Sequence, residues 1–187
     1  MNTLWITVVV IAGIFYLMYI NLILKRNKVK ESLAGVDVQL KKRHDLIPNI
    51  LKMAEKFMKH ERGLMEELTK LRTEAMKKSF NVDGAKKVEL ENLIDKKMHE
   101  LLISVENYPD LKSNQTMVQA MQSFEDVEEH IAAARRFYNS AILALRNAVE
   151  IFPMNIVATM VNVKADLPFF TADEEEKKSV DVSDYLK

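Results

Sequence analysis

The absence of charge from the first 24 residues constrains the fold of this chain more than any other feature. All 27 basic and 27 acidic residues lie after position 24. Residues 4–24 read LWITVVVIAGIFYLMYINLIL, and a helix of this length spans about 31 Å. The hydrocarbon core of a bilayer is about 30 Å thick. The run therefore predicts a transmembrane helix over residues 4–24, after a short extracytoplasmic end at residues 1–3.

The residues that flank this run favour a retained anchor over a cleaved signal peptide. A signal peptide has basic residues before its apolar region and small residues after it. Here the cations follow the run, at Lys25, Arg26, Lys28 and Lys30. Because positive charge beside a span stays in the cytoplasm, we expect the N-terminus outside, the rest of the chain in the cytoplasm, and the inner membrane as the location. The same four cations could attract anionic lipid headgroups.

The remainder of the chain has the composition of long helices. Glycine and proline number four each in 187 residues, too few for the frequent turns of a sheet protein. We therefore predict an all-α fold, with an elongated antiparallel bundle of three to four helices over residues 25–170. Residues 171–187 are acidic and lack an apolar period, which predicts a flexible tail.

Apolar residues at alternating spacings of three and four locate the helices of this bundle. One stripe runs from Val29 to Ala75 and predicts a first helix over residues 25–77. Pro48 interrupts it, so the chain either bends there or reverses to make a fourth long helix. We favour a kink, because the stripe keeps its phase through the proline. A second helix is expected over residues 84–107, a third from about Ser113 to Phe152, and a short one within residues 154–163.

The sequence lacks the motifs of several common enzyme and metal sites. The four glycines lie at least 21 residues apart, so no P-loop or dinucleotide-binding fingerprint can be written. Cysteine is absent, which removes thiol nucleophiles and cysteine-based metal sites. The four histidines lack ligand-pair spacing, and we expect each to be isolated and exposed (His44, His60, His99 and His130). The sequence predicts no catalytic residue, no cofactor, no metal and no nucleic-acid partner.

Six short motifs carry a resemblance to a known family. They are Arg26–Val29, Asp37–Ile50, His60–Glu61, Tyr108–Asn114, Ile131–Asn139 and Phe152–Ala158. In this order they resemble the LemA family over about residues 20–170. Two departures are Gly35, where the family usually carries a polar residue, and the segment Leu167–Phe170, which matches loosely.

The resemblance implies a bacterial single-pass membrane protein with an outside N-terminus, a cytoplasmic helical bundle and no established enzymatic activity. Members are often encoded beside membrane zinc peptidases or other envelope proteins. The leading hypothesis is a non-enzymatic scaffold or adaptor that engages an unidentified protein partner or anionic lipid. One alternative is a hydrolase-type enzyme with a cleft that gathers Arg43, Asp45, Glu61, Arg135 and Arg136. Another is a membrane-surface sensor that detects lipid charge through its basic neck, the four cations Lys25, Arg26, Lys28 and Lys30.

Two charged residues, Arg43 and Glu61, occupy positions on the first apolar stripe. A charge that faces a core needs a partner and hydrogen bonds, so each must meet a residue of another helix. We expect Arg43 to contact an acid such as Glu128, and Glu61 to contact Arg135 or Arg136. The full candidate polar network or partner surface comprises Asp37, Arg43, Asp45, Asn49, Glu61, Glu128, Arg135, Arg136 and Asn139.

Overall fold

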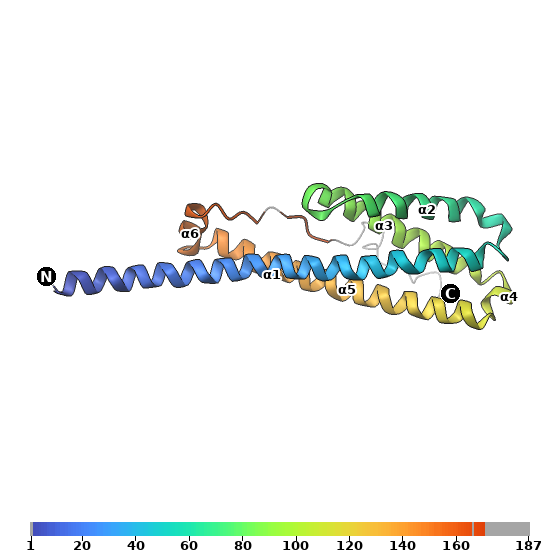
Figure 1. Ribbon diagram of the computed structural model, residues 1–187, viewed down its shortest axis with the longest axis horizontal. Coiled ribbons are helices and arrows are strands. Elements are labelled where there is room, and N and C mark those ends of the chain that lie inside the picture. Colours follow the sequence, from blue (N-terminus) through green and yellow to red (C-terminus); the bar gives the residue numbers. More distant parts are fainter. Residues whose placement is uncertain (1, 166, 171–187) are drawn as a thin grey trace, which may run out of the picture.

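The computed structural model describes residues 2–165 and 167–170, and every regular element within them is a helix. The all-α prediction is thereby confirmed for this part of the chain; the predicted tail at 171–187 lies outside the described residues. The elements are α1 (Asn2–Ala54), the 3-10 turn η1 (Lys59–Glu61), α2 (Arg62–Lys77), α3 (Phe80–Val105), α4 (Pro109–Lys112), α5 (Gln115–Glu150) and α6 (Met154–Met160) (Figure 1).

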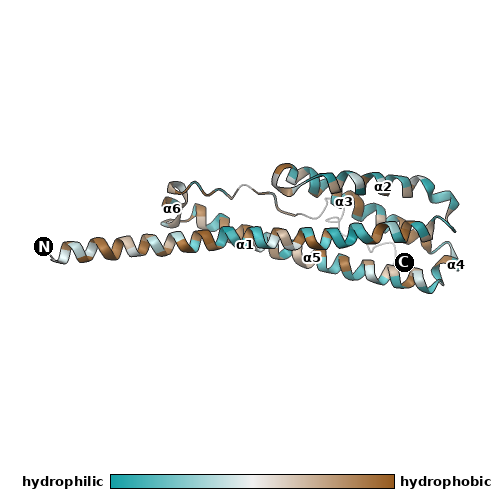
Figure 2. Ribbon diagram, viewed as in Figure 1, coloured by the Kyte–Doolittle hydropathy of each residue, from teal (hydrophilic) through white to brown (hydrophobic). Residues whose placement is uncertain are grey.

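Helix α1 carries the apolar run directly into the packed part of the molecule. Its first third extends alone beyond the other helices (Figure 1), and its large side chains there are exposed, including Trp5 at 66%. Figure 2 shows hydrophobic residues along this projecting part. By length and composition the helix could cross a membrane. From Leu22 onward, α1 buries one residue per turn or two against its neighbours (Leu22, Val29, Val36, Leu40, Ile47 and Ile50).

The other long helices lie side by side with α1 in alternating directions (Figure 1). Helix α5 runs back along α1, and α2 packs along α3. One apolar cluster joins the middle of α1 to α5 and α6. A second joins the end of α1 to α2, α3 and the start of α5. Each helix therefore buries one apolar face, as the spacing of three and four predicts.

The first helix ends at Ala54, so a kinked helix to residue 77 is wrong. The chain reverses over residues 55–61, where Met58 is fully buried beneath the turn. Pro48 lies six residues before the end of α1. A proline has no N–H, which leaves the carbonyl four residues before it without its helical donor. That carbonyl belongs to His44, and it accepts a hydrogen bond of 2.6 Å from Nε of Arg72 on α2.

The boundaries of the later helices differ slightly from expectation. Helix α3 begins at Phe80, but Asp83 inside it has non-helical angles (φ −120°, ψ 33°), so the expected break is present as a kink. Helix α5 is capped by Asn114 and not by Ser113: the Asn114 side chain accepts from the backbone N–H groups of Thr116 and Met117. The start of α5 follows from this cap, which satisfies two backbone N–H groups of its first turn.

After α6 the chain returns along the helices as an extended strap, residues 161–165 and 167–170 (Figure 1). Arg146 of α5 donates to the carbonyl oxygens of Ala165 and Leu167. The side-chain amide of Asn139 donates to the Phe170 carbonyl at 2.7 Å, and its oxygen accepts from the Phe170 N–H at 3.0 Å. These contacts fix the strap to α5.

Candidate functional site

A buried arginine gathers acids from two other helices at the centre of the molecule. The Arg43 side chain on α1 has no exposed area. Its Nη2 atom lies 2.5 Å from Oε2 of Glu91 and donates to the Glu91 carbonyl at 3.2 Å. Its Nη1 atom contacts Asp95 and lies 3.0 Å from Oε1 of Glu128. Arg43 therefore ties α1 to α3, through Glu91 and Asp95, and to α5, through Glu128.

Two further residues extend this group, which we call the Arg43 cluster (Arg43, His44, Glu91, Asp95, Glu128 and Arg135). Nε2 of His44 lies 3.1 Å from the same Glu91 oxygen that Arg43 contacts. Both terminal nitrogens of Arg135 donate to Oδ2 of Asp95 at 3.2 Å. The Arg135 guanidinium also lies 5.3 Å from the centre of the Phe170 ring, so the strap covers this end of the cluster.

The cluster keeps the Glu91 carboxyl in its charged form. Burial by itself raises the pKa of Glu91, because a low-dielectric interior disfavours a charge. The hydrogen bond to His44, the charges of Arg43 and His44 and the hydrogen bond to Arg43 all lower it, and together they hold the pKa of Glu91 below its ordinary value of 4.5. A carboxylate in this state accepts hydrogen bonds and does not donate a proton near neutral pH.

Access to the centre of the cluster is closed. The side chains of Arg43 and Glu91 are both 0% exposed, whereas Asp95, Glu128 and Arg135 are 20–29% exposed at its edge. A substrate could reach Arg43 or Glu91 only if α1, α3 and α5 moved apart. As it stands, the arrangement can pair charges between helices and offers an outside molecule only its edge.

Of the two ion pairs expected from the sequence, the structure contains one. The prediction that Arg43 meets Glu128 is confirmed by their 3.0 Å contact. The prediction that Glu61 meets Arg135 or Arg136 is wrong. Glu61 lies in η1, beyond the end of α1, which is about 16 Å from Arg43 at 1.5 Å per residue. Arg135 contacts Asp95 in the Arg43 cluster instead.

The remaining candidate residues lie apart from one another. Asp37 reaches Nζ of Lys87 on α3 at 3.0 Å. Asp45 is exposed and pairs with Lys41 along the same helix face. Arg136 is exposed on α5. With Glu61 in η1 and Arg43 buried, the five residues of the enzyme hypothesis do not line a common cleft.

Three members of the cluster were not predicted: Glu91, Asp95 and His44. His44 is 5% exposed, so the expectation of an exposed histidine is wrong at this position. The other three histidines are exposed. Glu91 and Asp95 are spaced four apart, each one residue after an apolar position of the α3 stripe, and this is the signal that could have identified them.

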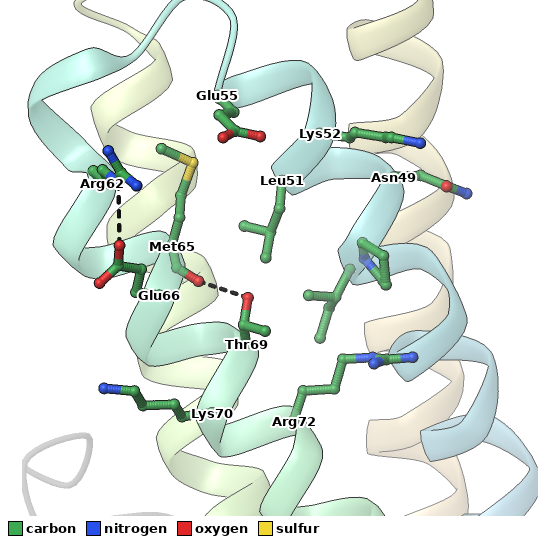
Figure 3. Close-up of a pocket in the computed structure, with 12 residues that line it drawn as sticks. Asn49, Leu51, Lys52, Glu55, Arg62, Met65, Glu66, Thr69, Lys70 and Arg72 are labelled. Atoms are coloured by element: carbon green, nitrogen blue, oxygen red, sulfur yellow. Dashed lines mark hydrogen bonds and ion pairs between the residues drawn. The ribbon is translucent and has the colours of Figure 1, made fainter.

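A separate groove lies at the far end of the molecule, between the end of α1 and α2 (Figure 3). Its volume is about 660 Å³. Leu51 and Met65 contribute apolar surface to it, and charged side chains of both signs surround them (Lys52, Glu55, Arg62, Glu66, Lys70 and Arg72). Asn49, a candidate from the sequence, also lines it. The groove thus combines an apolar floor with a mixed-charge rim.

Comparison with known proteins agrees with the family resemblance. Residues 32–183 match the LemA family. A curated relative, Protein LemA of Metamycoplasma hominis, is 25% identical over 176 residues, which cover 92% of this chain and 79% of the relative. The family match takes in α1 from Ser32 and all of the later helices, and therefore every residue of the Arg43 cluster. The chain belongs to the LemA family.

Proposed function

We propose that this protein is a membrane-anchored, non-enzymatic scaffold or adaptor of the bacterial envelope. In this proposal residues 4–24 span the inner membrane once, and residues 25–170 form an elongated antiparallel bundle of three to four helices in the cytoplasm. The observation that carries it is the continuity of α1, a single helix of 53 residues from the apolar run to the turn after Ala54. Because one continuous helix belongs to both the anchor and the bundle, it holds the far end of the bundle at a fixed distance from the membrane.

The Arg43 cluster supports a structural role for the charged motif residues. Pairing Arg43 with acids of both α3 and α5 makes one register of these helices much more favourable than its neighbours, because a slip leaves a charge buried without a partner. The motif positions Arg43 and Arg135, and their partners Glu128 and Asp95, then have a structural role that needs no substrate.

The groove between α1 and α2 is the surface that we expect a protein partner to contact. Its apolar floor suits one face of an extended or helical segment, and its rim carries both charges for orienting that segment. It also lies at the opposite end of the molecule from the projecting part of α1 (Figure 1), so a partner there would be held at a fixed distance from the bilayer.

Site-directed photocrosslinking in intact cells tests this proposal. A photoreactive amino acid is placed at Asn49 or Lys70 in the groove, and at Ser123, an exposed position of α5, as the matched control. We expect the two groove positions to crosslink the same protein, identified by mass spectrometry, and the control position not to. Identical adducts from all three positions, or none from the groove, would contradict a partner at this surface.

A further inference from the structure

An uncharged segment lies beside the anchor helix at the end of the molecule that faces the proposed membrane. Residues 151–163 read IFPMNIVATMVNV, without a charged side chain between Glu150 and Lys164. This segment contains the turn after α5, the whole of α6 and the start of the strap. Helices α5 and α6 are bent by 92° at the turn, and by length and composition the pair is apolar enough for a membrane segment.

The segment has a buried face that packs on the anchor and an apolar face without cover. Val157 and Ala158 are buried and share a cluster with Met18 and Leu22 of α1. On the other side, Phe152 and Met160 are 73% and 76% exposed. Further exposed apolar side chains lie beside them (Ile151, Ile156 and Val161). Five exposed apolar side chains within eleven residues are typical of contact with a membrane or another protein.

The packing of α6 on α1 sets the depth at which this surface would lie in the bilayer. Met18 and Leu22 belong to the apolar run, and Met18 precedes Lys25 by about 10 Å along the helix. A helix that lies in the membrane interface buries its apolar face about 5–10 Å into the headgroup and acyl boundary. With residues 4–24 in the bilayer, α6 would therefore lie at this depth, and Figure 1 shows it beside α1 at the point where the projecting part of α1 begins.

We propose that residues 151–163 form a second membrane-contacting element, with α6 in the cytoplasmic lipid interface beside the anchor and Phe152 and Met160 among the acyl chains. The inference rests on the proposed function only in that α1 spans the bilayer. It adds that the bundle is held against the membrane at two points, which fixes its tilt. Continuity with the anchor selects lipid as the occupant over a second protein.

Fluorescence quenching in vesicles tests the proposal on the full chain. Because the sequence has no cysteine, single-cysteine variants accept one fluorophore each. The labels are placed at Phe152→Cys and Met160→Cys, with Leu17→Cys in the anchor and Ser123→Cys on α5 as controls. The proteins are reconstituted in phosphatidylcholine vesicles that contain phosphatidylglycerol and a lipid with a nitroxide on its acyl chain.

We expect labels at 152 and 160 to be quenched by the acyl-chain nitroxide at least about threefold more than the label at 123, and to resist aqueous iodide. An unquenched label at 17 would show that the anchor itself fails. Quenching at 17 without quenching at 152 and 160 would leave the anchor standing and overturn the second element. Labels at 152 and 160 shielded from both quenchers would mean that protein, and not lipid, covers this surface, which also overturns it.

A variant with one added charge tests whether the quenching arises from the protein surface or from the fluorophore itself. Phe152→Asp in the Met160→Cys background adds one charge at an exposed position, so the fold has no reason to change. We expect acyl-chain quenching at 160 to fall at least about twofold, because a charge resists the acyl region. The same substitution at Ser123 should leave it unchanged. Equal quenching with and without the charge at 152 would overturn the proposal.

Discussion

Arg43 contributes more to the stability of the fold than its neighbours on α1, because it pairs with three acids. Changing Arg43 to Met leaves Glu91 buried without its main partner, and breaking a buried pair costs about 3–5 kcal/mol. Glu128→Leu should cost less, about 1 kcal/mol, since Glu128 is at the edge and Arg43 keeps Glu91. Chemical unfolding of the full chain in detergent measures both changes.

The same measurement identifies which acid is the true counterpart of Arg43. In the double variant Arg43→Met, Glu91→Leu the buried charge disappears from both sides, so we expect recovery of much of the lost stability. The double variant Arg43→Met, Glu128→Leu should show no such recovery. Arg136→Met, on the exposed face of α5, is the control and should leave stability unchanged. Equal recovery in both double variants would refute this ranking.

The lowered pKa of Glu91 gives stability a definite pH dependence. The folded protein releases this proton at lower pH than the unfolded chain, whose carboxyl titrates near 4.5. The contribution of Glu91 is therefore complete above pH 4.5 and declines as pH falls through the folded-state pKa, because the unfolded state then binds more protons.

We accordingly expect Glu91→Gln to destabilise the protein most above about pH 5, and the gap from wild type to narrow on acidification. Unfolding free energies of both proteins between pH 7 and the acid limit of folding measure this gap. Glu89→Gln, on the exposed side of α3, serves as the control and should give no pH-dependent gap of this kind. A gap that is constant or grows toward acid would contradict a lowered pKa.

Sequence reasoning found Arg43 and its contact with Glu128 but missed the more buried partner. The position of Arg43 on an apolar stripe is a property of one helix and can be read from spacing. Which acid meets it depends on how three helices are aligned, and spacing within each helix does not fix that alignment. Glu91 also lies just beside its stripe, where an acid is ordinarily expected to face solvent.

At the scale of elements, the end of α1 is where the sequence was misleading. The apolar period continues through Ile47, Ile50 and Ala54 and resumes in α2, so a single long helix fits the pattern equally well. The reversal at residues 55–61 contains neither glycine nor proline, the usual signals of a turn. It is stabilised instead by tertiary packing, with Met58 buried in the cluster that α2 and α3 complete.

The hydrogen bond between Arg72 and the His44 carbonyl joins α1 to α2 just before this reversal. Because Pro48 supplies no N–H to that carbonyl, Arg72→Met should leave it without a donor and cost about 1–3 kcal/mol. In the double variant Pro48→Ala, Arg72→Met, the new N–H at position 48 can bond to His44 within the helix. We expect the loss caused by Arg72→Met to shrink in this background, as measured by a double-mutant cycle.

Lys70→Met supplies the matched control for the cycle, since Lys70 also lines the groove but lacks this hydrogen bond. It should behave identically in the wild-type and Pro48→Ala backgrounds. An Arg72→Met effect that is the same in both backgrounds would mean that Arg72 stabilises the protein by packing alone, and that the missing N–H of Pro48 is immaterial.

At the scale of the whole molecule, the four cations after the apolar run (Lys25, Arg26, Lys28 and Lys30) predict an orientation in the membrane. Arg26, Lys28 and Lys30 are exposed and Lys25 is half-buried, and the ion pair of Lys28 with Glu31 lies on the exposed surface. With these cations held in the cytoplasm, protease added to intact spheroplasts should spare everything after Lys25. Opening the spheroplasts should expose the same chain to digestion.

Replacing the four neck cations by Gln separates their effect from that of the apolar run. The span remains, but the charge that orients it is gone, so we expect part of the population to become digestible from outside. Four Gln substitutions at the far end of the molecule, at Lys52, Lys56, Lys59 and Lys70, remove the same charge at least 27 residues beyond the neck's Lys25 and should leave the orientation unchanged. Digestion of the wild-type bundle in intact spheroplasts would place it outside the cytoplasm. Equal effects of the two sets of substitutions would mean that net charge, and not its position beside the span, sets the orientation.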